Sequence, residues 1–194
     1  AYVSRELGLE ALGHLFLAFL FVTLFQMVPN LVQQVFLAPV VARWRAGDAA
    51  SIRQELRRFL WILIAYCAAV ATALALVAQP IVALILPQHA ADLRWVYALA
   101  PGLMVFALSG PFSLSYNVMI EYRWYLIAYF GGAAITAIAF MAAWLSDRVL
   151  SLDEVVGLRS AVFALMGVTL MIGARRVNAR APEFRLFGGV APAT

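Results

Sequence analysis

Four runs of more than 18 residues without a charged side chain limit what this chain can fold into. Soluble cores do not contain several such runs, because an element in water needs polar residues on its outer face. A transmembrane helix needs about 20 predominantly apolar residues to cross a hydrocarbon core of roughly 30 Å. Hydrophobic residues make up 65% of the sequence and charged residues 12%, whereas soluble domains average about 45–50% and about 25%. The sequence therefore predicts an all-α, polytopic transmembrane helix bundle.

We expect about five spans within a bundle over residues 11–176. The first four contain the long uncharged runs, whereas only residues 160–174 are uncharged in the fifth. We therefore begin the fifth span at Val155, with Arg159 one turn inside it and able to snorkel outward. Residues 1–10 are predicted to be an outer segment and residues 177–194 a cytoplasmic tail. The predicted spans are residues 11–42, 59–86, 95–116, 124–145 and 155–174.

A basic connection, RWRAGDAASIRQELRR, joins the first two spans. Ser51, followed three residues later by Gln54, fits a helix-capping box. The apolar residues that follow fall on one helical face. These residues are Ile52, Leu56, Phe59 and Leu60. We expect an amphipathic surface helix over residues 49–58 that runs directly into the second span.

The distribution of arginine indicates how the spans are oriented. All 14 basic residues are Arg. With five spans, ten of them fall on one side and four on the other. Cytoplasmic loops carry the excess of positive charge, so the ten, and with them the C-terminus, are predicted to face the cytoplasm from a bacterial inner membrane. The arginines lie at span ends rather than on one soluble face, so we do not expect a nucleic-acid partner.

The uncharged runs offer few groups for catalysis. No carboxylate lies within a predicted span, and His14 has no acid or nucleophile beside it. The single cysteine, Cys67, lies in an apolar run and is typical of a small buried hydrophobe. We predict that the chain is not an enzyme and binds no metal and no cofactor. Because the first residue is not Met and no signal peptide precedes the first span, we expect a segment of a longer protein.

Amide side chains form a stripe in the first span. Gln26, Asn30 and Gln33 are spaced i, i+4 and i+7, so they share one helical face. Amides in contact with lipid are costly, and the stripe should therefore face protein or water. Two interpretations stay open. The stripe makes hydrogen bonds between helices, or it forms the wall of a polar cavity.

The end of the third span repeats this pattern. Ser109, Ser113 and Asn117 are predicted to share a face, and Glu121 and Arg123 follow at the membrane edge. One interpretation is a capped helix end with an interfacial ion pair. The other is a head-group contact or gate at the mouth of a cavity.

Three arginines of the first connection, Arg43, Arg45 and Arg53, are predicted to lie at the level of lipid head groups. Attraction to anionic lipid explains them. A pyrophosphate-bearing lipid substrate would use the same chemistry with better geometry.

Together these features resemble a known family. The stretch QMVPNLVQQVFLAPVVARWRAGDAASIRQELRRFLWILIAY is similar to a recurring unit of polysaccharide-type flippases, in which a Pro-containing helix end, a basic turn and an amphipathic helix lead into another span. Pro39, Arg43, Arg45, Gly47 and Asp48 hold those places. The stretches PIVALILPQHAADLRWVYALAPGLMVFALSG and EYRWYL resemble the next helices and their connection. The resemblance, over residues 15–176, is to the lipid-linked oligosaccharide flippases of the multidrug/oligosaccharidyl-lipid/polysaccharide exporter superfamily.

The resemblance implies most of one lobe of a two-lobe exporter. One departure is DRVLSLDEVVGLRS, where members usually carry a short Pro/Gly-rich turn before the last helix. The implied function is flipping of a polyprenyl-pyrophosphate-linked oligosaccharide for polysaccharide export. Its partners would be the lipid-linked glycan, membrane lipids and the remaining helices of the full-length protein. Two alternatives stay open. A small-molecule exporter of the same superfamily predicts an acid or aromatic trap, which this segment is expected to lack. A non-transporting scaffold of a glycan-assembly complex predicts that the stripe contacts partner helices.

Overall fold

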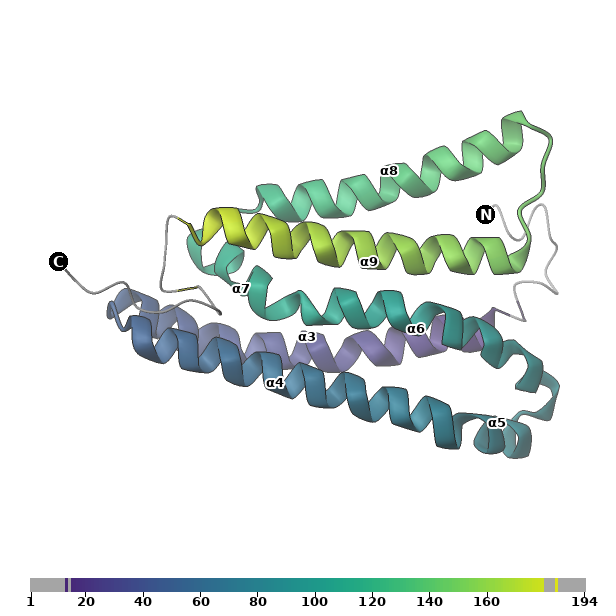
Figure 1. Cartoon of the computed structure of the whole chain (residues 1–194), viewed down its shortest axis with the longest axis horizontal. Helices are drawn as coiled ribbons and strands as arrows, with labels where there is room; N and C mark the ends of the chain where they lie inside the picture. The colour runs from purple at the N-terminus through teal and green to yellow at the C-terminus, as the bar shows by residue number, and fades with distance from the viewer. Residues whose placement is uncertain (1–12, 14, 180–183, 185–194) are drawn as a thin grey trace.

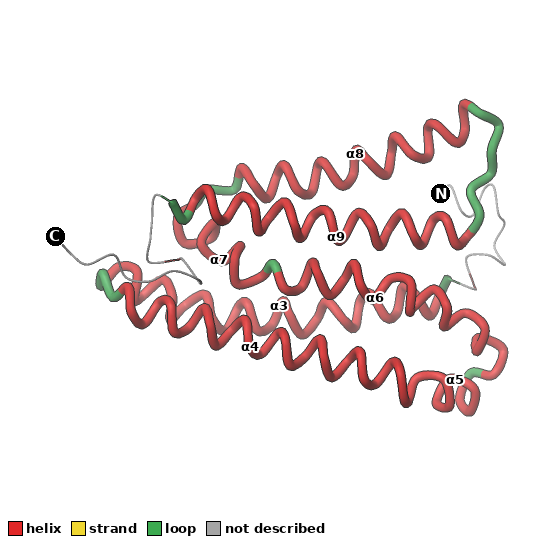
Figure 2. The backbone as a smooth tube through the Cα atoms, viewed as in Figure 1, coloured by secondary structure: helices red, strands yellow, loops and turns green. Residues whose placement is uncertain are grey.

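The computed structural model describes residue 13, residues 15–179 and residue 184. These residues form helices joined by short loops at the two ends of an elongated bundle (Figures 1 and 2). Five segments among them are long and apolar enough to cross a membrane. The predicted all-α membrane bundle is confirmed, and the chain is a multi-pass membrane protein. The predictions for residues 1–10, His14 and most of the tail lie outside the described residues.

The first two crossing segments, α3 (Phe16–Arg45) and α4 (Ala49–Ala73), lie antiparallel. After α4 a π-helical turn leads into α5, and a 3₁₀ turn then leads into α6. A short helix, α7, follows α6, and two long helices complete the bundle. The bounds of these later elements are Leu74–Ala78 for the π turn, Gln79–Ile85 for α5, Pro87–Asp92 for the 3₁₀ turn, Leu93–Leu108 for α6, Gly110–Met119 for α7, Arg123–Leu145 for α8 and Leu152–Val177 for α9.

The corner between α3 and α4 differs from the predicted capping box. The helix starts three residues earlier than Ser51 would allow, and Asp48 is its N-cap. The Asp48 carboxylate accepts a hydrogen bond of 3.1 Å from the Ser51 backbone N–H. Gly47 makes this start possible, because it turns the chain at a φ of 70°, which glycine adopts without strain. The amphipathic helix and second span are continuous, as predicted.

Prolines interrupt two of the spans. The π turn ends two residues before Pro80, and the predicted third span is two helices, broken at Ser109 two residues before Pro111. Proline has no N–H for the helical ladder, and its ring clashes with the preceding turn. Each interruption therefore stands where a proline removes a backbone hydrogen bond.

Close packing holds α9 against α6, beside which it lies in Figure 1. A Cβ on Gly102 would collide with the backbone carbonyl of Ser160. A Cβ on Gly167 would lie 2.8 Å from the carbonyl oxygen of Val105. These contacts leave room for hydrogen only, so the two backbones approach as closely as small residues permit in membrane helices.

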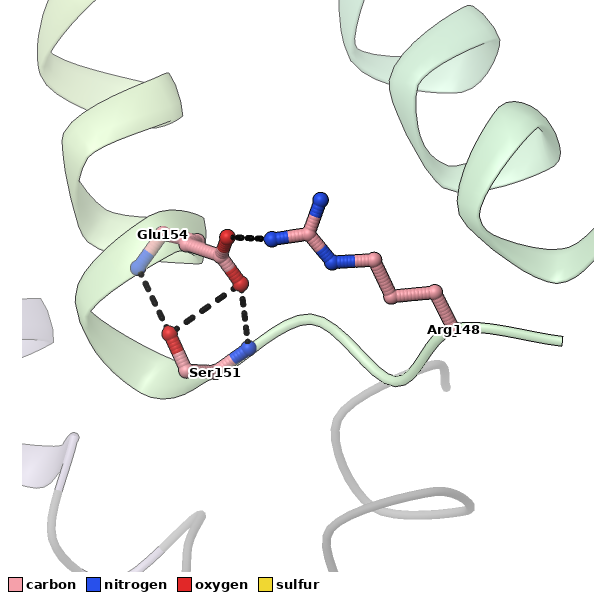
Figure 3. A network of polar contacts seen from close by, with 3 residues as sticks. All are labelled: Arg148, Ser151 and Glu154. Atoms are coloured by element: carbon pink, nitrogen blue, oxygen red, sulfur yellow. Dashed lines mark hydrogen bonds and ion pairs between the residues drawn. The ribbon is translucent and has the colours of Figure 1, made fainter. Parts of the chain in front are cut away.

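The start of α9 is fixed by a capping box that the predicted start at Val155 missed (Figure 3). The Ser151 hydroxyl accepts from the Glu154 backbone N–H at 3.3 Å. The Glu154 carboxylate in return accepts from the Ser151 backbone N–H at 2.9 Å. Arg148 pairs with the same carboxylate. The helix therefore begins at Leu152, three residues before the predicted start.

Arginines gather at one end of the bundle. The end of α3, the starts of α4 and α8 and the end of α9 lie together in Figure 1. Of the arginines within the described residues, eight lie in these segments and three lie at or near the opposite end. We refer to the eight as the arginine-rich end: Arg43, Arg45, Arg53, Arg57, Arg58, Arg123, Arg175 and Arg176.

Candidate functional site

A small cavity lies between α3, the α6–α7 break and α8. Its volume is about 50 Å³, enough for a few water molecules by the criterion of about 10–15 Å³ each. Five of the six residues predicted to line a substrate path meet here. These five are Gln26, Asn30 and Gln33 of α3, with Ser109 and Ser113 of the α6–α7 segment. The two polar patterns seen separately in the sequence are therefore one site.

The amides of the stripe have different surroundings. The Gln33 side-chain amide donates to the Tyr125 hydroxyl on α8 at 3.4 Å, which is long for this type of bond. Within the described residues, Gln26 and Asn30 make no side-chain hydrogen bond. Asn30 is exposed, and Gln26 is half-buried. A hydrogen bond between helices thus accounts for Gln33, whereas the amides of Gln26 and Asn30 line the cavity without such a bond.

The two serines present acceptors. The Ser109 hydroxyl donates to the Phe106 carbonyl at 2.6 Å, and the Ser113 hydroxyl donates to the Gly110 carbonyl at 2.9 Å. Both side chains are buried. Because each hydroxyl uses its proton on its own helix, its oxygen lone pairs are what it offers to the cavity.

The sixth predicted residue, Asn117, is half-buried near the end of α7 and does not line the cavity. Glu121 and Arg123 lie beyond it, in the turn before α8 and at the first position of α8. The turn begins at Ile120, whose φ of 56° ends α7 in a left-handed conformation. These residues mark the arginine-rich end of the bundle rather than the cavity itself.

The three predicted phosphate-binding arginines differ in their contacts. Arg43 pairs with Glu55 across the corner at 2.6 Å and donates to the Ser51 carbonyl at 3.3 Å. Arg53 donates to the Ala49 carbonyl at 3.4 Å. Arg45, the last residue of α3, is exposed. Arg43 therefore supports the α3–α4 corner, and Arg45 is better placed to meet a ligand.

Aromatic side chains complete the cavity. Phe25, Phe106, Tyr125 and Tyr129 line it, and the rings of Phe106 and Tyr129 meet edge to face with centroids 6.1 Å apart. Aromatic side chains were not expected here from the sequence. These residues come from three helices, so no spacing along the sequence could reveal them. The tyrosines of α8, one turn apart in an apolar run, were the available signal.

Among the described residues, no group of three His, Cys, Asp or Glu side chains could hold a metal ion. The cavity instead offers amides, hydroxyls and aromatic faces, which bind neutral polar or apolar groups without covalent chemistry.

Comparison of the chain with protein-family models, with curated proteins and with solved structures gives no match. The functional argument therefore depends on the cavity and on the distribution of charge.

Proposed function

We propose that this chain forms one wall of a polar path in a membrane transporter that flips a polyprenyl-pyrophosphate-linked oligosaccharide from the cytoplasmic to the outer leaflet of the inner membrane. The observation that carries the proposal is the cavity at the middle of α3, where Gln26, Asn30 and the two serines meet. A glycan cannot cross hydrocarbon unaided, because its hydroxyls and phosphates would lose their hydration. Amides and hydroxyls along a path replace part of that hydration.

The exposure of Asn30 supports a path that extends beyond these helices. An amide in contact with lipid would lack hydrogen-bond partners, so water or further protein faces it. A cavity of about 50 Å³ holds a few waters and no sugar ring. The substrate would therefore pass between this wall and further helices of the same protein, as in a two-lobe exporter.

Charge supports the orientation of the bundle in the membrane. Positive residues mark the cytoplasmic side, so the arginine-rich end, and with it the end of α9, is assigned to the cytoplasm. There Arg45 and Arg123 are exposed. Guanidinium groups bind phosphate oxygens in pairs, and these two would receive the pyrophosphate at the inner mouth.

The test of the path is cysteine labelling in cells. Cys67 is buried, and replacing it with Ala leaves a background without cysteine among the described residues. In that background, Asn30→Cys should react with a membrane-impermeant thiosulfonate. Val28→Cys is the matched control, since it lies at nearly the same depth but on the opposite face of α3, and it should not react. Equal labelling of both would contradict the proposal. If Asn30→Cys stays unlabelled but cross-links to another protein, the scaffold interpretation holds instead.

The test of transport uses Gln26→Leu combined with Asn30→Leu. Cells with this variant should accumulate the lipid-linked glycan on the cytoplasmic side, because two polar groups of the wall are lost. The Val28→Leu variant, on the opposite face, should export normally. Normal export by the double variant at normal protein levels would refute the role of the stripe.

A second function, export of small molecules, is favoured by one specific observation. Phe25, Phe106, Tyr125 and Tyr129 surround the cavity, and aromatic faces bind apolar or cationic compounds. This function predicts that Tyr129→Ala lowers the resistance of a drug-sensitive strain while glycan export continues. The flippase function predicts instead that Tyr129→Ala lowers glycan export and leaves drug resistance unchanged. The two assays on one variant therefore distinguish them.

A further inference from the structure

A second pocket lies towards the opposite end of the bundle from the arginine-rich end. It is formed by the start of α3, the first half of α6, the second half of α8 and the start of α9, and its volume is about 290 Å³. Its lining is apolar apart from Thr136 and Arg159. It shares no residue with the polar cavity, so the transport path does not account for it.

Arg159 is the charged residue of this pocket. Its guanidinium lies over the ring of Phe163, 4.5 Å from the ring centroid. Phe163 is one turn further along α9, on the same face of the helix. Within the described residues, no carboxylate pairs with Arg159. The two other arginines near this end, Arg94 and Arg148, both have carboxylate partners, Asp153 and Glu154.

The depth of Arg159 identifies the kind of anion that can reach it. Helix α9 has 26 residues and is about 39 Å long, against a hydrocarbon core of roughly 30 Å. Arg159 is seven residues from its start, or about 10 Å, which is roughly 5 Å inside the hydrocarbon boundary. A soluble anion does not enter this region, whereas the phosphate of a membrane lipid lies at its edge.

We propose that this pocket binds an anionic glycerophospholipid, with the lipid phosphate on Arg159 and an acyl chain along the apolar wall between α3 and α8. The guanidinium of Arg159 would bind the lipid phosphate, and the apolar lining would hold the acyl chain. A fixed lipid at this site stabilises a charge that would otherwise be costly in the membrane. It also fills the space between the α3 and α8 sides of the bundle.

The test is native mass spectrometry of the purified protein in detergent, titrated with dioleoyl phosphatidylglycerol or dioleoyl phosphatidylethanolamine. Phosphatidylglycerol should bind at the lower concentration. Arg159→Gln should weaken its binding about tenfold, the loss expected for one charge-assisted hydrogen bond. Arg94→Gln is the matched control, because Arg94 is 64% exposed near the same end and does not line the pocket. Its phosphatidylglycerol binding should be unchanged.

A second variant tests the acyl-chain position without removing the charge. Thr136→Phe fills the pocket from α8 and should also weaken phosphatidylglycerol binding. Phosphatidylglycerol should raise the unfolding temperature of the unaltered protein and of Arg94→Gln, and not that of Arg159→Gln. Equal binding of the two lipids, or full binding by both pocket variants, would overturn the proposal. The pocket would then be covered by another segment of protein.

Discussion

The hydroxyl of Tyr66 on α4 donates a hydrogen bond of 3.0 Å to the backbone carbonyl of Phe25 on α3. That carbonyl would bond to residue 29 in an uninterrupted helix, but residue 29 is proline and has no N–H. Tyr66 therefore supplies the donor that Pro29 removes. The bond joins two neighbouring spans directly beside the polar cavity, and it keeps an unsatisfied carbonyl out of the hydrocarbon.

Replacing Tyr66 with Phe should destabilise the bundle by about 1 kcal/mol, since a partly buried carbonyl loses its partner. Denaturation in mixed micelles, followed by circular dichroism, measures the change. Tyr122→Phe is the matched control, because Tyr122 lies in the exposed turn between α7 and α8 and its hydroxyl makes no hydrogen bond among the described residues. Equal stability of the two variants would show that the Tyr66 bond adds nothing.

Glycine at position 102 should tolerate no side chain. Gly102→Ala places a methyl group against the Ser160 carbonyl, so we expect a loss of about 3 kcal/mol, the upper end of typical overpacking effects. Gly131→Ala on α8 meets nothing within 4 Å and should be neutral or slightly stabilising, because alanine favours a helix. The same unfolding assay compares them. A Gly102→Ala protein as stable as Gly131→Ala would contradict the close approach of α6 and α9.

Asp48 should make stability depend on acidity. Hydrogen bonds from Ser51 hold the pKa of this exposed carboxyl below its usual value of 3.8. The folded state thus prefers the ionised form, and the contribution is full above pH 3.8 and is lost as the pH falls through the lower folded-state pKa. Asp48→Asn keeps the cap and should remove the loss of stability that begins as the pH falls below 3.8, seen as a flatter profile of unfolding free energy against pH. An equally steep profile for Asp48→Asn and the unaltered protein would contradict this role of Asp48.

Arg43 should act through Glu55 rather than through a substrate. A double-mutant cycle with Arg43→Gln and Glu55→Gln should give a coupling of about 0.5 kcal/mol, as expected for a partly exposed pair. Arg45→Gln should instead reduce glycan export without changing stability. Export and unfolding measured on the same preparations separate the two roles. If Arg43→Gln lowered export and left stability intact, the phosphate role would return to Arg43.

The sequence predicted an all-α membrane bundle, because a long uncharged run in a membrane must form a helix, and five of the described segments are long and apolar enough to cross one. Its errors lie where a local hydrogen bond decides a boundary. Ser51 with Gln54 and Ser151 with Glu154 both match a capping pattern, and only the second is used. At the first, Gly47 turns the chain early enough for Asp48 to cap the helix. Hydrophobicity carries no information about that choice.

The polar residues of the cavity were predicted from the spacing of amides and hydroxyls along single helices. Their meeting was not, since it depends on how α3 packs against α6 and α7. The aromatic wall was missed for the same reason. The partner of Arg43 was missed because Glu55 lies across a turn whose shape follows from Gly47 and Asp48.

The fit of α9 against α6 has a consequence for biosynthesis. α9 leaves the ribosome after both α6 and α8, so the groove around Gly102 has no occupant while the earlier spans are being inserted. The closely packed pair of α6 and α9 therefore forms late in synthesis. Until α9 is inserted, the face of α6 around Gly102 is covered by lipid or by an insertion chaperone.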